Sequence, residues 1–167
     1  MESTLKLGVA GLSDLDSIQA VVREVWPVAY KNVITTEQIE YMLKMMYDNE
    51  SLLRQMNEDG CQFLLAKKNE KVVGFASYSE TQPTCFKLHK LYVLTTEQGS
   101  GAGKKLLNEV CAAARKKGGT TLELQVNKKN SKAIEFYLRN GFQKHHEAVF
   151  DIGNGFVMDD FIMIRNL

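Results

Sequence analysis

The feature that most constrains the fold is the glycine-rich hexapeptide Gln98–Gly103, because it separates two segments with different hydrophobic periods. The segment before it, at about 85–94, is rich in strand-forming residues, and apolar residues recur at helical spacing over 106–114. Glycines at alternate positions leave backbone N–H groups uncovered at the start of this helix, where the helix dipole favours negative charge. The hexapeptide therefore predicts either a structural turn or a site for an anion such as phosphate.

Two familiar nucleotide-binding motifs do not fit this loop. A Walker loop would have glycine at position 98 and serine or threonine at position 105, where this chain has Gln98 and Lys105. A dinucleotide-binding fingerprint would have glycine at position 104, which Lys104 occupies. An anion bound at the loop would therefore belong to a different kind of ligand.

The rest of the chain alternates between strand-like and helix-like patterns, which predicts a mixed α+β layer protein. The expected strands are 5–9, 63–66, 72–78, 85–94, 121–126, 142–151 and 156–165. The expected helices begin near 13, 35, 103 and 130. This order is strand, two helices, three strands, helix, strand, helix and two strands.

Composition narrows the class of protein. With 167 residues, of which 44% are apolar, the chain is long enough for one domain, over 1–167, and too short for two. The 21 basic and 20 acidic residues nearly balance, so we expect no nucleic-acid or membrane partner. The start lacks a signal-peptide pattern and no apolar run reaches ~18 residues, so we expect a cytoplasmic protein. The spacing of Cys61, Cys85 and Cys111 argues against a disulfide framework and against a metal site.

Two motifs carry a resemblance to a known family. The strand Leu91-Tyr92-Val93 followed by Gln98-x-x-Gly101-x-Gly103 resembles the pyrophosphate-binding motif of the GNAT acetyltransferase superfamily. The segment Asn127-x-x-Asn130-x-x-Ala133-x-x-Phe136-Tyr137-x-x-x-Gly141-Phe142 is similar to the next motif of that superfamily. The resemblance implies a central mixed, mostly antiparallel, twisted sheet flanked by helices. A looser resemblance links the chain to bacterial spermidine/spermine acetyltransferases.

The resemblance also implies acetyl-CoA as co-substrate. Its pyrophosphate would lie on the glycine loop, its pantetheine arm would pair with the backbone of 91–93, and Asn130 would hydrogen-bond it from the other side. Backbone N–H groups of 91–93 would also stabilise the oxyanion. The implied cofactor residues are Leu91, Tyr92, Val93, Gln98, Gly99, Ser100, Gly101, Ala102, Gly103, Lys104, Asn130, Ala133, Phe136 and Tyr137.

Two side chains are candidates for proton transfer. The resemblance assigns Tyr137 to the departing thiolate, which requires a lowered tyrosine pKa or a raised thiol pKa; otherwise Tyr137 acts as a hydrogen-bond donor or is a core residue. Some family members have a carboxylate base where this chain has Lys87. His89 shares that side of a regular strand and is the candidate base, with a structural histidine or a water chain as alternatives.

The acceptor is expected to be a small-molecule or peptide amine. Residues 13–50 hold seven acidic and three basic residues, which would attract a cation, although ordinary solvated helix faces give the same count. The hypothesis is a polyamine acceptor, with Glu24, Tyr30 and Glu37 as recognition candidates, ahead of a peptide N-terminus or an aminoglycoside. A non-catalytic acyl-CoA sensor, a generic phosphate binder and a homodimer stay open.

Overall fold

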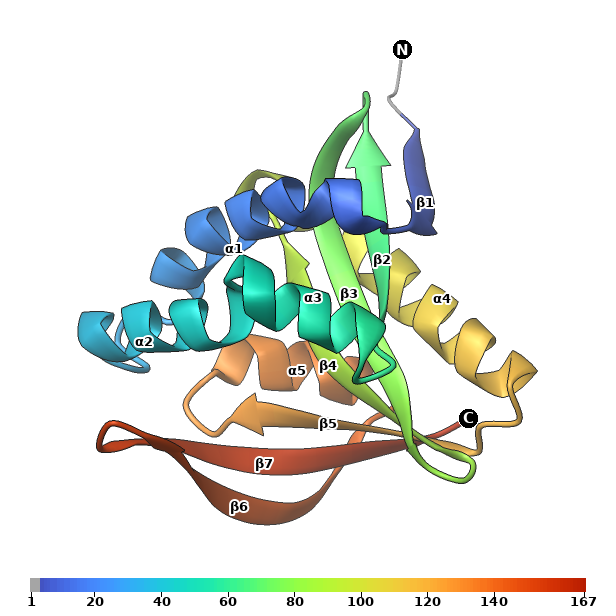
Figure 1. Ribbon diagram of the computed structural model, residues 1–167. Coiled ribbons are helices and arrows are strands. Elements are labelled where there is room, and N and C mark those ends of the chain that lie inside the picture. The colour runs from blue at the N-terminus through green and yellow to red at the C-terminus, as the bar shows by residue number, and fades with distance from the viewer. Residues whose placement is uncertain (1–3) are drawn as a thin grey trace.

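A computed structural model describes residues 4–167, so Met1–Ser3, where the signal-peptide expectation lies, are outside the described residues. One seven-stranded sheet has the order β1-β2-β3-β4-β5-β7-β6 (Figure 1). Only β4 and β5 are parallel among these neighbours. The strands are β1 (Leu5–Val9), β2 (Gln62–Lys68), β3 (Lys71–Gln82), β4 (Cys85–Val93), β5 (Thr121–Asn127), β6 (Gln143–Gly153) and β7 (Phe156–Asn166). The predicted mixed, mostly antiparallel sheet is confirmed.

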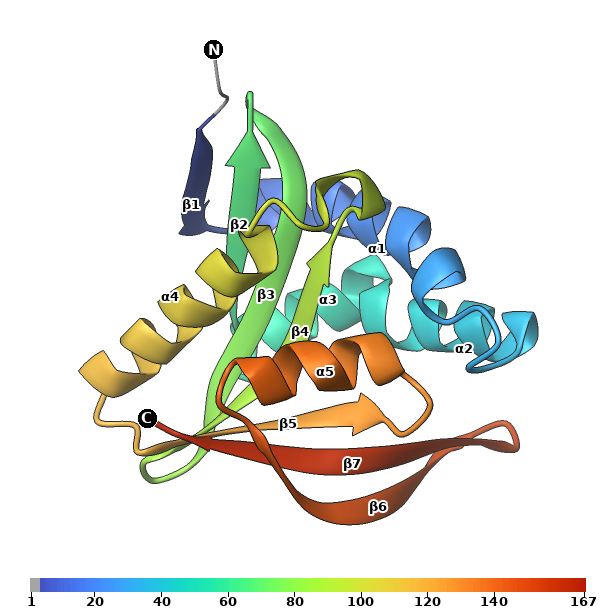
Figure 2. The same ribbon diagram turned by 180° about the vertical axis from the view of Figure 1, so that it is seen from behind.

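Helices cover both faces of the sheet. The helices are α1 (Leu15–Ala29), α2 (Thr36–Tyr47), α3 (Asn49–Asn57), α4 (Ala102–Lys116) and α5 (Ser131–Arg139). The first three lie on one face, and α4 and α5 lie on the other, as the two opposite views show (Figures 1 and 2). Apolar side chains at helical spacing direct α1 and α4 to the sheet; Ile18 and Leu106 are both fully buried. None of the helices within residues 4–167 is long and apolar enough to cross a bilayer.

Helix α3 was not predicted, so the expected order was wrong by one helix. Asp48 has an extended backbone (φ −67°, ψ 163°) that ends α2, and its side chain accepts a hydrogen bond from the Ser51 N–H at 2.7 Å to begin α3. Only Ser51 and Leu52 of α3 are buried, so the helix has no long apolar stripe to reveal it. Asp48 is the sequence signal, because aspartate is a preferred N-cap residue.

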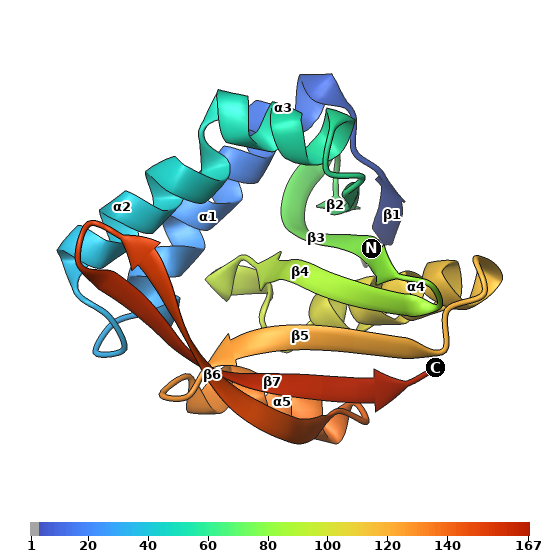
Figure 3. The same cartoon turned by 60° about the horizontal axis from the view of Figure 1, so that its bottom comes forward.

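The parallel pair β4 and β5 separates in the middle of the sheet. The two strands pair only over Cys85–Leu88 and Thr121–Leu124, although β4 continues to Val93 and β5 to Asn127. Figure 3 shows them diverging toward their C-terminal ends. Within residues 4–167, the facing edges of these last residues therefore have no strand partner. The divergence positions the candidate active site.

Candidate active site

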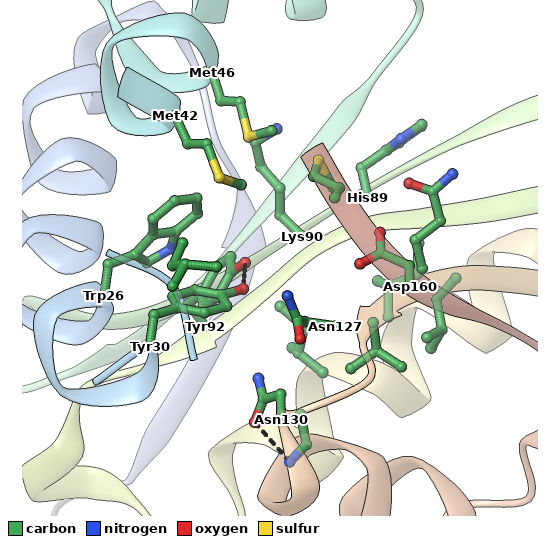
Figure 4. A pocket seen from close by; sticks show the side chains of 18 of the residues that line it. Trp26, Tyr30, Met42, Met46, His89, Lys90, Tyr92, Asn127, Asn130 and Asp160 are labelled. Atoms are coloured by element: carbon green, nitrogen blue, oxygen red, sulfur yellow. Dashed lines mark hydrogen bonds between the residues drawn. The ribbon is translucent and has the colours of Figure 1, made fainter. Parts of the chain in front are cut away.

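A cavity of about 260 Å³ lies where β4 and β5 separate. Its walls come from α1, α2, β4, β5, α5 and β7, and Figure 4 shows side chains from these elements around one space. The predicted residues Tyr30, Leu91, Tyr92, His89, Asn130, Ala133 and Tyr137 line it. The structure thus brings together residues that the sequence placed in three separate segments.

The glycine loop begins α4 with exposed backbone amides. Gly99 and Gly101 both have φ of 86°, in the left-handed region that favours glycine, and a Cβ at either position would meet no atom within 4 Å. The N–H groups of Gly99, Gly101, Gly103 and Lys104 have no hydrogen-bond acceptor within residues 4–167, whereas that of Ala102 reaches the Ser100 hydroxyl at 3.4 Å. Open space, free N–H groups and a helix N-terminus fit a phosphate group.

Contacts with α5 hold the loop in place. The Lys132 ammonium donates a hydrogen bond to the Gln98 side-chain oxygen at 2.5 Å, and the Phe136 ring lies 3.5 Å from the position of a Cβ on Gly103. Asn130 begins α5, and its side-chain oxygen accepts a hydrogen bond from the Ala133 N–H at 3.3 Å. That oxygen serves the helix cap, so the side-chain N–H₂ of Asn130 is the group left to face the cavity.

Tyr137 lines the cavity from α5 and is partly buried between the rings of Phe136 and Phe142. Burial, assisted by the nearby Tyr30, raises its pKa above the usual range. The lowered pKa considered from the sequence is therefore not found. Because the same burial would also raise the pKa of a thiol beside it, a neutral Tyr137 that donates its hydroxyl hydrogen is the consistent arrangement.

His89 lies in an irregular part of β4. The register between β3 and β4 shifts between Ser77, which faces Lys90, and Tyr78, which faces Leu88. The His89 Nε2 atom hydrogen-bonds the Ser79 hydroxyl at 2.6 Å. Partial loss of water around the ring, with the charges of Lys87 and Lys90, lowers the His89 pKa to about 4, so the ring is neutral at pH 7 but is a weaker base than a free imidazole.

The sequence-predicted recognition residues separate into two groups. Tyr30 lines the cavity, and its hydroxyl oxygen lies 3.1 Å from that of Tyr92 in a hydrogen bond. Glu24 and Glu37 are exposed on α1 and α2 and do not line the cavity. His145 and His146 are also exposed, on β6, with their Nδ1 atoms 2.7 Å apart. None of the seven acidic residues in 13–50 lines the cavity.

Sequence reasoning missed two charged side chains in the cavity, Asp160 on β7 and Lys90 on β4. Asp160 is 2% exposed and its Oδ2 atom has no hydrogen-bond partner within residues 4–167. Burial, with the charge of Asp159, raises its pKa to about 6. Strand alternation was the available signal for Asp160, since it shares a face with Met158 and Ile162.

Comparison with known proteins agrees with this geometry. The model of the Acetyltransferase (GNAT) family matches residues 19–142. The chain belongs to the GNAT acetyltransferase family. The fold and family that the two motifs predicted are thereby confirmed.

An uncharacterized N-acetyltransferase of Mycobacterium tuberculosis is 27% identical over 156 residues, which cover 93% of this chain and 99% of the relative. The spermidine N(1)-acetyltransferase of Thermoplasma acidophilum is 27% identical over 160 residues, 93% of this chain and 96% of the relative.

Solved structures of GNAT proteins superpose on nearly the whole chain. The PaiA N-acetyltransferase of Thermoplasma acidophilum, solved in complex with coenzyme A, has a TM-score of 0.84 at 27% identity and covers 98% of this chain and 99% of its own. A GCN5-related N-acetyltransferase of Rhodopseudomonas palustris has a TM-score of 0.83 at 20% identity, with 100% and 99% covered, and shares the fold. The chain is an N-acetyltransferase, and the fold with its coenzyme A-bound neighbour supports acetyl-CoA as the co-substrate.

Proposed function

We propose that the protein transfers the acetyl group of acetyl-CoA directly to the primary amine of a small molecule held between β4 and β7. The observation that carries this proposal is Asp160, a buried carboxylate without a partner for Oδ2 in the described chain, which lines the cavity opposite β4 (Figure 4). An unpaired buried carboxylate is costly, and a cationic ligand relieves that cost. An amine is such a ligand when it arrives protonated.

The transfer forms one bond and breaks another. The amine must lose its ammonium proton, and its nitrogen lone pair then attacks the thioester carbonyl carbon. The C–N bond forms, the C–S bond breaks, the nitrogen gives up a second proton, and the coenzyme A thiolate takes a proton to leave as a thiol. The protein must therefore accept protons near the amine, stabilise an oxyanion and donate to sulfur.

Each requirement has a candidate at the cavity or, for the pyrophosphate, on the glycine loop outside its lining. The open edge of β4 at Leu91–Val93 would supply backbone N–H groups to the oxyanion and to the pantetheine arm. Tyr137 would donate its hydroxyl hydrogen to the sulfur, as a neutral phenol. His89, hydrogen-bonded to Ser79, would pass the amine proton on to water rather than hold it, because its pKa is lowered to about 4. The free amides of the loop at 99–104 would hold the pyrophosphate.

A polyamine is a second candidate for the acceptor. It is favoured by the 27% identical relative named spermidine N(1)-acetyltransferase. Against it, Glu24 and Glu37 lie outside the cavity, and Asp160 is the one carboxylate among the residues that line it. A linear polycation needs several acidic partners, so the cavity itself favours an acceptor with fewer positive charges.

The test is release of free thiol from acetyl-CoA with a panel of amines, comparing wild type with Tyr137→Phe. The panel holds spermidine, spermine, lysine peptides, peptides with a free N-terminus, amino acids and aminoglycosides. Acceptor-dependent release that falls in the variant, with acetyl-CoA binding retained, would support the proposal. Tight coenzyme A binding without release from any acceptor would instead favour the acyl-CoA sensor.

A further inference from the structure

The cavity carries opposite charges on opposite walls. Lys87 and Lys90 are lining residues from β4, and Asp160 lines the cavity from β7; Figure 4 labels Lys90 and Asp160. With His89 neutral, two lysines stand against one carboxylate among the 22 lining residues. This balance is unusual for a site that receives only an amine, because a cationic acceptor is repelled by lysines.

Asp160 is the side chain that can bind the amine of the acceptor. It lies directly opposite Asn127 in the β5–β7 ladder, so both side chains are on the same face of the sheet where β4 has moved away. Asn127 uses its side-chain oxygen to accept the Lys129 N–H at 2.9 Å. The Asp160 Oδ2 atom has no hydrogen-bond partner in the described residues, so it is left as an acceptor for a ligand that enters between β4 and β5.

Lys90 has no such counterpart in the protein. No carboxylate lies within 4.0 Å of its ammonium or of that of Lys87 in residues 4–167. The Lys90 Nζ atom lies 5.0 Å from the centroid of the Tyr47 ring, and its side chain extends toward Met46 of α2 (Figure 4). Burial, with the charge of Lys87, lowers its pKa to about 8, which shows that the protein alone stabilises this charge poorly.

Apolar side chains fill the space beside these charges. Met42 and Met46 of α2 and Met158 of β7 line the cavity, together with Ile34. Methionine side chains adapt to ligands of different shape. A cavity of about 260 Å³ with this lining suits a small molecule that has an aliphatic or aromatic part besides its charged groups.

We propose that the acceptor is a small zwitterion, an amino acid or a similar amine that carries its own carboxylate, with its amine near Asp160 and its carboxylate bound by Lys90. The apolar part of the acceptor would lie among the three methionines. This inference rests on the proposed function and selects an amino acid over a polyamine as its acceptor.

The experiment compares acceptors that differ only in the carboxylate. Methionine, leucine and phenylalanine are each assayed beside the corresponding amide and the corresponding decarboxylated amine, with spermidine in parallel. The readout is the ratio of kcat/KM for the acid to that for the decarboxylated amine. We expect this ratio to exceed about ten in wild type for at least one trio, since a charge-assisted hydrogen bond changes affinity by roughly ten- to hundredfold.

Variants of Lys90 test whether this side chain causes the preference for the acid over the decarboxylated amine. Lys90→Met, close in shape and uncharged, should bring the ratio near one by raising KM for the acid alone, whereas Lys90→Arg should keep most of it. Lys144→Met is the matched control, because Lys144 also lies over an aromatic ring, 4.3 Å from the Phe161 centroid, but is exposed and outside the cavity. It should leave the ratio unchanged.

Failure of the zwitterion inference can be distinguished from failure of the proposed function. Decarboxylated amines or spermidine that react as well as the acids in wild type, or a ratio that Lys90→Met leaves intact, would overturn the zwitterion inference and leave the amine acetyltransferase standing. Reaction with none of these acceptors would overturn the proposed small-molecule amine acceptor, and the inference with it. Retained acetyl-CoA binding by Lys90→Met shows that the variant is folded.

Discussion

The glycine loop (98–104, the loop end of the site) does not line the cavity, whereas Lys87, His89, Lys90 and Asp160 (the acceptor end) do, and the two present different parts of the chain to a ligand. The loop end offers backbone N–H groups from one continuous segment. The acceptor end offers side chains from β4 and β7, with α1 and α2 closing over them. Backbone groups are common to all residues, so the loop end suits an invariant co-substrate, whereas side chains can change to suit one acceptor.

The largest effect should come from Tyr137, which lies between the two ends. Tyr137→Phe removes the hydroxyl and keeps the ring that packs on Phe136 and Phe142. We expect kcat to fall about 100-fold or more, with the acetyl-CoA dissociation constant changed less than about twofold. Steady-state kinetics and calorimetry measure the two quantities. A variant with full kcat would make Tyr137 a core residue and leave the thiolate without a donor.

The next effect tests whether the loop end acts through its backbone. Gly101→Val places a side chain over the free amides and should weaken acetyl-CoA binding by roughly ten- to hundredfold. Gly118→Val is the matched control, because Gly118 also has a positive φ (84°, against 86° for Gly101) and open space around it. Both changes strain the backbone by about 1–2 kcal/mol. If both variants bind acetyl-CoA equally well, the loop is a structural turn.

A smaller effect tests the acceptor end through Asp160. Asp160→Asn should raise the acceptor KM about tenfold and leave acetyl-CoA binding unchanged, since only the acceptor meets this side chain. Asp160 is ionised above its pKa of about 6, so kcat/KM for the acceptor should rise through pH 6 in wild type. A pH profile of the variant should lack that step.

Stability is the control for this variant. The folded-state pKa of Asp160 is about 6 against 3.8 in the unfolded chain, so the folded protein loses stability as pH rises from about 4 to above 6. Asn carries no such charge, and Asp160→Asn should increase the free energy of unfolding at pH 7 by up to about 3 kcal/mol. Denaturant unfolding at pH 5 and pH 7 measures this. Lower stability of the variant at pH 7 would mean that the carboxylate has an unrecognised partner.

The smallest effect concerns the acidic surface outside the cavity. Glu24→Gln with Glu37→Gln removes two exposed charges that the sequence nominated for recognition. We expect a change in acceptor KM below about twofold at physiological salt, because exposed charges are screened. Acceptor titrations at low and high salt check this. A larger rise in KM for spermidine alone would show that Glu24 and Glu37 contact the acceptor and that a polyamine is the acceptor.

The difference between the two ends also explains what the sequence could predict. The loop and Tyr137 belong to short motifs whose spacing is fixed by one strand-to-helix connection each, so they were found at the right places in the fold. Lys90 was missed because regular strand alternation would put its side chain on the other face of the sheet from His89. The register shift at Ser77 and Tyr78 interrupts that alternation, and it is a tertiary feature. Alternation places Asp160 on the same face as Met158 and Ile162, but the cavity beside it exists because β4 moves away from β5, which is a tertiary feature.

The separation of β4 and β5 has a consequence for the behaviour of the protein in concentrated solution. A strand edge with free hydrogen-bonding groups is normally a template on which another chain can add and aggregate. Here such an edge lies in the interior of the sheet, with α1 and α2 on one side and α5 on the other (Figures 1 and 2). The edge borders a cavity of about 260 Å³ instead of the rim of the sheet. The fold can thus keep a reactive edge permanently available without the risk of self-association that the same edge would bring at the rim.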